Sequence, residues 1–174
     1  MFERLVDLIV EFAQLFQFFF YVEHYEQAVV LRFGKYSRTV GPGPHWIWPA
    51  SMEDAISVNI KPEPMYCDTQ SLTTSDGYII NLQVGFTLRV TDAKTYLLDH
   101  EHTDDTIAML LSGIVADKVA ESTWEDVHSG DWRKGLRAKA NKKARKRGAL
   151  IIELIVQDLA SGDANRLWIE GVEL

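Results

Sequence analysis

The sequence has little of the chemistry that holds disulfides, metals or catalytic sites. Its single cysteine, Cys67, excludes an intramolecular disulfide and a thiolate metal cluster, and is compatible with a reducing compartment. With only 5 prolines and 11 glycines, the chain is not collagen-like or of low complexity. No Gly-x-Ser-x-Gly elbow, Walker loop or His-Glu-x-x-His helix occurs. We therefore expect no enzyme, no cofactor and no metal site.

The chain also lacks a hydrophobic run long enough to cross a bilayer as a helix. The hydrophobic stretch near its start, residues 12–22, is free of charge over only 11 residues, whereas a spanning helix needs about 20 apolar residues. The acidic residues before this stretch argue against a secretory signal peptide. At helical period the first 22 residues separate into an apolar and an acidic face, which predicts an amphipathic helix in the membrane interface. The alternative is a helix packed on the domain's own core or on a neighbouring subunit.

Two aromatic segments are the candidates for membrane contact. The first is the end of the predicted N-terminal helix. The second is the segment 41–49, where three prolines and two glycines predict an irregular, stiff loop. This loop either contacts the membrane or closes one end of the core. The predicted membrane-contact residues are Phe12, Leu15, Phe16, Phe18, Phe19, Phe20, Tyr21, Trp46 and Trp48.

The rest of the chain alternates between strand and helix periods. Strands are predicted at 27–33, 56–60, 78–90 and 150–157, with residues 65–74 pairing across a turn at 75–77. Helices are predicted from Asp104 to about Val119, from Thr123 to about Gly130 and at 131–147. The acidic doublets at 53–54, 104–105 and 125–126 are attributed to turns and helix N-termini. This order predicts an α+β fold with a largely antiparallel sheet and packed helices.

Positive charge is concentrated in one segment of an acidic chain. The net charge is −7, yet residues 133–147 hold nine of the 18 basic residues and no acid. In the predicted helix, Trp132, Leu136, Ala140 and Ala144 form a narrow apolar seam and the remaining surface is cationic. Such a surface suits lipid headgroups, nucleic-acid phosphates, the acidic surface of a neighbouring subunit, or solvent alone.

Of these partners we favour the neighbouring subunit. Phosphate binding normally brings stacking aromatics or a recognised motif, and neither accompanies this segment. The expected oligomer-interface residues are Arg133, Arg137, Lys142, Lys143 and Arg145. The alternative function is a soluble nucleic-acid-binding protein that uses the basic helix 133–147.

Four motifs in order resemble one known family. They are Glu26-Gln-Ala-Val-Val-Leu-Arg-Phe-Gly-Lys-Tyr36, Gly41-Pro-Gly-Pro-His-Trp46, Thr73-Thr-Ser-Asp-Gly77 and Leu88-Arg-Val-Thr-Asp92. From about His24 to Ala160 the chain resembles the SPFH or Band 7 domain of stomatins, prohibitins, flotillins and the bacterial HflK and HflC proteins.

The resemblance implies a membrane-associated scaffold anchored to one leaflet. It also implies a large homo-oligomer, a ring or cage, that organises a lipid microdomain and has a membrane protease or channel as partner, with no nucleic acid. We accordingly divide the chain into an anchoring segment (1–23), the SPFH domain (24–160) and a short tail (161–174) in place of the family's long coiled coil.

Overall fold

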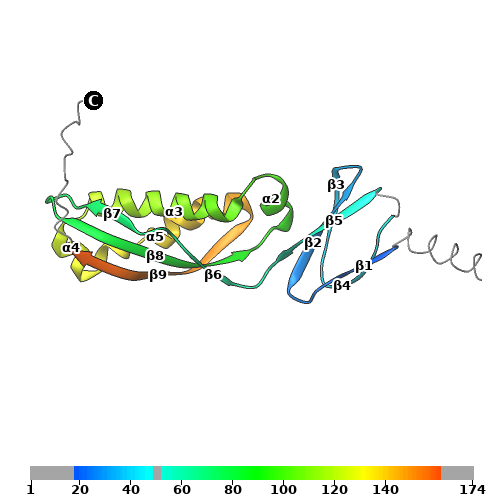
Figure 1. The fold of residues 1–174 in the computed structure, drawn as a ribbon, viewed down its shortest axis with the longest axis horizontal. Helices are drawn as coiled ribbons and strands as arrows, with labels where there is room; N and C mark the ends of the chain where they lie inside the picture. Colours follow the sequence, from blue (N-terminus) through cyan, green and yellow to red (C-terminus); the bar gives the residue numbers. More distant parts are fainter. Residues whose placement is uncertain (1–17, 49–51, 162–174) are drawn as a thin grey trace, which may run out of the picture. The chain divides into compact units, whose positions relative to one another are not determined.

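The computed structural model describes residues 18–48 and 52–161, which gather into two compact units (Figure 1). Each unit is built from segments that are distant in the sequence. Among the described residues, the first draws on 18–48, 52–63, 88–103 and 144–150, and the second on 64–87, 104–143 and 151–161. The predicted α+β class is confirmed.

The first unit contains two small antiparallel sheets. In one, β2 (Glu26–Arg32) lies between β3 (Lys35–Val40) and β5 (Glu53–Asn59), and its Ala28, Val29 and Val30 are at most 1% exposed. In the other, β1 (Phe19–Val22) pairs with β4 (Gly43–Trp46). A short helix, α2 (Ala93–Leu98), starts at Asp92, whose carboxylate accepts backbone N–H bonds in the first turn.

Two predictions for the aromatic segments of this unit are wrong. The helix predicted to run to residue 22 is a strand from Phe19, because aromatic and β-branched side chains favour a pleated surface and β4 supplies the hydrogen-bond partners. The segment predicted to be irregular contains β4. Pro44 is accommodated there because an edge strand does not need every backbone N–H. The predicted contact residues Phe12, Leu15 and Phe16 lie outside the described residues.

The second unit is organised around β8 (Ile79–Val90), which pairs with β6 (Glu63–Tyr66), β7 (Gln70–Thr73) and β9 (Ala149–Ser161). The predicted hairpin is confirmed, with Gln70 opposite Leu82 and Thr73 opposite Ile79. The predicted alternation is confirmed too, since every second residue of this stretch is buried: Ile80, Leu82, Val84 and Phe86.

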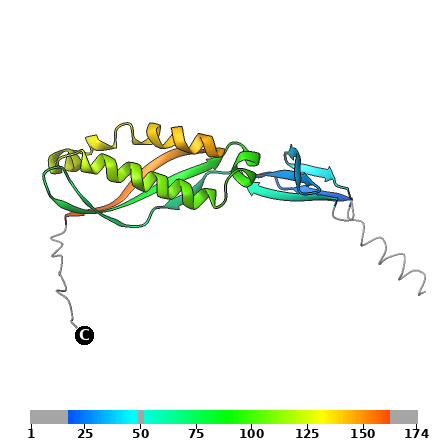
Figure 2. The same ribbon diagram turned by 90° about the horizontal axis from the view of Figure 1, so that it is seen from above.

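The helices predicted from Asp104 and from Thr123 are confirmed. The apolar stripe of α3 (Thr103–Ala120) is buried apart from a half-buried Leu110, and α4 (Trp124–Ser129) starts with a capping box between Thr123 and Asp126. The stripe consists of Ile107, Leu110, Leu111, Ile114, Val115 and Val119. Figure 2 shows α3 and α5 (Leu136–Ala144) running along the strands.

One predicted helix, 131–147, is wrong as a continuous element. The chain forms η1 (Asp131–Arg133), then α5, then η2 (Arg145–Arg147). The break before α5 falls at Gly135, whose φ of +81° is left-handed and incompatible with a right-handed helix. The predicted apolar seam is confirmed, because its four members are at most 4% exposed.

Candidate membrane-contact surface

The β1–β4 ribbon gathers aromatic side chains on one exposed face. Directly paired residues share a face, so Phe19 lies beside Trp46 and Tyr21 beside Pro44. Phe19, Tyr21 and Trp46 are 64%, 70% and 52% exposed. The Phe19 ring meets the Trp46 ring edge-on at 4.7 Å between centroids, and Phe18 lies 5.3 Å from Trp46.

We call these side chains, together with the 55% exposed Trp48, the aromatic face: Phe18, Phe19, Tyr21, Trp46 and Trp48. The opposite face of the ribbon is more enclosed. Phe20 is half-buried with its ring 5.6 Å from His45, and Val22 is 1% exposed. The ribbon therefore has one wet aromatic side and one packed side, and Phe20 belongs to the packed side.

A buried ion cluster holds the end of β4 in place. The side chain of Glu53 is fully buried, and it accepts hydrogen bonds from Arg32 (2.9 Å) and Arg38 (2.9 and 3.2 Å). Arg38 also donates to the carbonyl oxygen of Trp46 at 2.7 Å, and the backbone N–H of Trp48 donates to Glu53 at 3.2 Å. The backbone of both tryptophans is thus tied to the three-stranded sheet.

These bonds shift the pKa of the Glu53 carboxyl. The hydrogen bond from Arg38 is the main cause, supported by Arg32 and by the Trp48 backbone, and together they outweigh burial and lower the pKa from 4.5 to about 2. The carboxylate is therefore charged at neutral pH. The turn or helix start predicted at residues 53–54 is wrong, because both residues lie in β5.

Two further exposed apolar side chains of this unit, Phe33 and Met52, were not among the predicted membrane-contact residues. Phe33 is 72% exposed at the β2–β3 turn, and its backbone N–H donates to Met52, which is 41% exposed. Phe33 and Gly34 have φ values of +50° and +74°, the pattern of a type I′ turn, where Asn-Gly is preferred. The sequence signal that could have revealed the exposed Phe33 is a phenylalanine before Gly34, where a two-residue hairpin turn prefers asparagine.

The predicted oligomer-interface residues are exposed, but they do not lie on one helix. Arg133 is in η1, Arg137, Lys142 and Lys143 are in α5, and Arg145 is in η2. Arg145 falls in the first unit and the other four fall in the second.

The sequence profile of the SPFH domain / Band 7 family matches residues 20–165. The chain belongs to the SPFH/Band 7 family. This SPFH chain is 23% identical over 123 residues to Protein HflK of Buchnera aphidicola subsp. Schizaphis graminum, covering 71% of the chain and 30% of that protein. It is 25% identical over 109 residues to the Modulator of FtsH protease HflK of Escherichia coli K12, covering 63% and 26%. Against Protein HflK of Vibrio cholerae the identity is 27% over 108 residues, covering 60% and 27%.

The SPFH chain therefore spans less than a third of the length of these relatives. In the described part of the chain, no helix is both long enough and apolar enough to cross a bilayer.

Proposed function

We propose that this SPFH chain is a membrane-associated scaffold that touches one leaflet through its aromatic face and assembles with further copies of itself. The observation that carries the proposal is a set of exposed aromatics on a ribbon tied down by a buried carboxylate. Family membership supports the scaffold role. The name of the Escherichia coli relative, a modulator of FtsH protease, supports a membrane protease as the partner.

The physical case rests on the kind of side chain and on its fixed position. Tryptophan and tyrosine are favoured at the headgroup level because the rings are apolar and each carries one polar group. Burying the exposed part of one such ring contributes about 1–2 kcal/mol, so several rings acting together give firm attachment. Because the ribbon is already ordered, little conformational entropy is lost on binding.

Vesicle flotation of the full chain tests the membrane role. The triple variant Phe19→Ser, Tyr21→Ser, Trp46→Ser removes exposed aromatics of the ribbon. The matched control, Tyr66→Ser with Tyr78→Ser, removes aromatics of the second unit that are 58% and 54% exposed. We expect the triple variant to lose most of its vesicle binding and the control to keep it.

Equal flotation of the triple variant and the control would contradict membrane contact through the aromatic face. The same preparations also separate the alternative function. Salt-sensitive binding to polynucleotide without lipid would favour a nucleic-acid-binding protein over a scaffold.

A further inference from the structure

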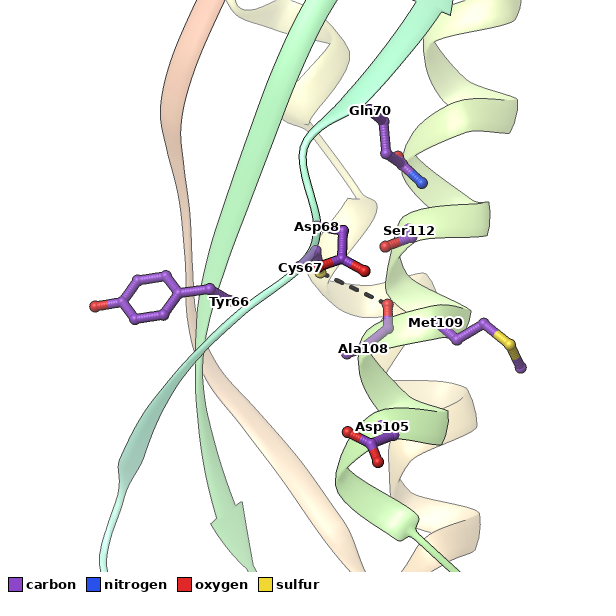
Figure 3. Close-up of a pocket in the computed structure, with 8 residues that line it drawn as sticks. All are labelled: Tyr66, Cys67, Asp68, Gln70, Asp105, Ala108, Met109 and Ser112. Atoms are coloured by element: carbon purple, nitrogen blue, oxygen red, sulfur yellow. Dashed lines mark hydrogen bonds between the residues drawn. The ribbon is translucent and has the colours of Figure 1, made fainter.

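The second unit has an open groove between α3 and the segment that joins β6 to β7 (Figure 3). It encloses about 450 Å³. Its walls include Cys67, Asp68 and Gln70 on the strand side and Asp105, Met109 and Ser112 on the helix side. In Figure 3 the Asp68 side chain points across the groove toward α3.

The groove exists because the strand beside β8 is interrupted. β6 ends at Tyr66 and β7 begins at Gln70, so the exposed Asp68 and Thr69 belong to neither strand. Cys67 is buried and fixes the segment, since its N–H donates to Val84 (2.8 Å) and its thiol to the Ala108 carbonyl (3.6 Å). The interruption leaves the exposed Asp68 side chain lining the groove.

The groove is acidic and has an apolar rim. Asp68 and Asp105 are both exposed, and no lysine, arginine or histidine of residues 18–48 and 52–161 lies within 4 Å of either carboxylate. Met109 at the rim is 67% exposed, and methionine adapts readily to an incoming surface.

The other edge of the same sheet is basic. Figure 1 draws β8 between β7 and β9, and side chains of α5 bond to the backbone of β9. Asn141 donates to the Ile151 carbonyl (2.9 Å) and accepts from the Ile151 N–H (2.7 Å), while Arg137 donates to the Ile152 carbonyl (2.9 Å). These bonds hold α5 against β9 at Ile151 and Ile152, and the lysines of α5 are exposed.

We define the basic strip as the exposed cations of the second unit in this region: Arg133, Lys134, Arg137, Lys139, Lys142 and Lys143. Within the described part of the chain, Lys139 and Lys142 have no carboxylate within 4 Å. Like charges on neighbouring positions of a helix repel one another, as Lys139 and Lys142 do three residues apart, so an acidic partner would stabilise α5.

We propose that the acidic groove of one copy receives the basic strip of a second copy. This inference rests on the proposed scaffold function and names the surfaces that would join the copies. Groove and strip lie at opposite edges of one sheet, so the contact is heterologous: every copy offers a strip to one neighbour and a groove to the other. Repetition of such a contact gives a ring where the rotation closes.

Charge reversal tests the pairing in the full chain purified in mild detergent, with particle mass measured at low and high salt. The groove variant is Asp68→Lys with Asp105→Lys, the strip variant is Lys139→Glu with Lys142→Glu, and the combined variant carries all four. A matched control, Asp117→Lys with Glu121→Lys, makes the same charge change near the end of α3, where cations suit the helix dipole and the change removes only the exposed ion pair of Glu121 with Lys118 at 3.9 Å.

In the groove variant and in the strip variant, like charges face each other. We therefore expect the particles of each variant to fall apart at a protein concentration at least about tenfold higher than that at which wild-type particles dissociate. The combined variant should regain wild-type particles, and the control should keep them. Raising the salt should loosen the wild-type particles, since exposed charges are screened beyond about 10 Å at 0.1 M.

A second measurement does not depend on how the variants fold. Carbodiimide joins a carboxylate directly to a lysine, and in an equal mixture of light and ¹⁵N-labelled wild-type protein it should link Asp68 or Asp105 of one copy to Lys139 or Lys142 of another. Links between copies that never include the groove would overturn the proposal.

The outcomes separate this inference from the function on which it rests. A monomeric wild-type protein would contradict the proposed scaffold itself. Large wild-type particles that the strip variant dissolves and the groove variant leaves intact would keep the scaffold but overturn the groove as the receiving surface. Failure of the combined variant to reassemble, with both partial variants folded, would do the same.

Discussion

Replacing Glu53 with a neutral residue should lower the free energy of unfolding of the first unit and weaken the attachment of Trp46 and Trp48. In Glu53→Gln the neutral amide still accepts a hydrogen bond, but Arg32 and Arg38 lose the charge that holds them. One pKa unit corresponds to about 1.4 kcal/mol, so a shift from 4.5 to about 2 sets an upper limit of roughly 3 kcal/mol. The side chains of Arg32 and Arg38 are 50% and 35% exposed, and solvent screening reduces the expected loss to about 2 kcal/mol.

The assay is urea unfolding of full-length wild type and Glu53→Gln, followed by circular dichroism at several pH values. The folded-state pKa of Glu53 is lowered, so its contribution is complete above about pH 5 and is lost as the pH falls from 4.5 towards 2. The difference between the two proteins should therefore be about 2 kcal/mol at pH 7 and shrink as the pH approaches 2.

The matched control is Asp54→Asn, the same loss of charge at the next residue of β5, where the side chain is exposed. We expect it to change the free energy of unfolding by less than about 0.5 kcal/mol. If Glu53→Gln were no more destabilising than this control, or equally destabilising at pH 7 and pH 2.5, the ion cluster would not be what holds β4.

Three further changes have defined outcomes. Phe33→Asn should raise stability by about 1 kcal/mol in thermal unfolding, because asparagine tolerates the left-handed turn position better; a melting temperature at or below that of wild type would contradict a left-handed Phe33. Gly148→Ala should destabilise the protein by about 2 kcal/mol or more, because the new Cβ would collide with the Asp92 carbonyl oxygen and because φ at this position is +74°. A melting temperature within error of wild type would show that the backbone after η2 does not have this conformation. Asn141→Ala should cost about 1–2 kcal/mol and speed hydrogen exchange at Ile151, and unchanged exchange there would mean that α5 does not cover this edge.

Long elements with a single strong period were predictable from the sequence. The alternation over β8 and the apolar stripe of α3 each extend over several turns or residue pairs, so only one structure fits. The capping box of α4 was predictable for a different reason, because it is a local pattern with its own hydrogen bonds.

The aromatic ribbon and its anchor were not predictable in the same way. An unbroken run of apolar residues, as at Phe18–Val22, satisfies helix and strand periods alike, and its strand partner is β4, beyond two further strands. Glu53 is buried only because Arg32 and Arg38 reach it, from 21 and 15 residues away. Non-local pairs of this kind produce no periodic pattern in the sequence. The aromatic residues were therefore predicted as membrane contacts, whereas the ion cluster that positions Trp46 and Trp48 was not predicted.

The most direct test of membrane contact is the quenching of tryptophan fluorescence by brominated lipids in vesicles that carry the full chain. The account predicts that part of the wild-type emission is quenched, that Trp46→Phe with Trp48→Phe abolishes this quenched part, and that Trp124→Phe retains it. Equal quenching in the Trp46/Trp48 double variant and in wild type would show that the aromatic face does not meet lipid.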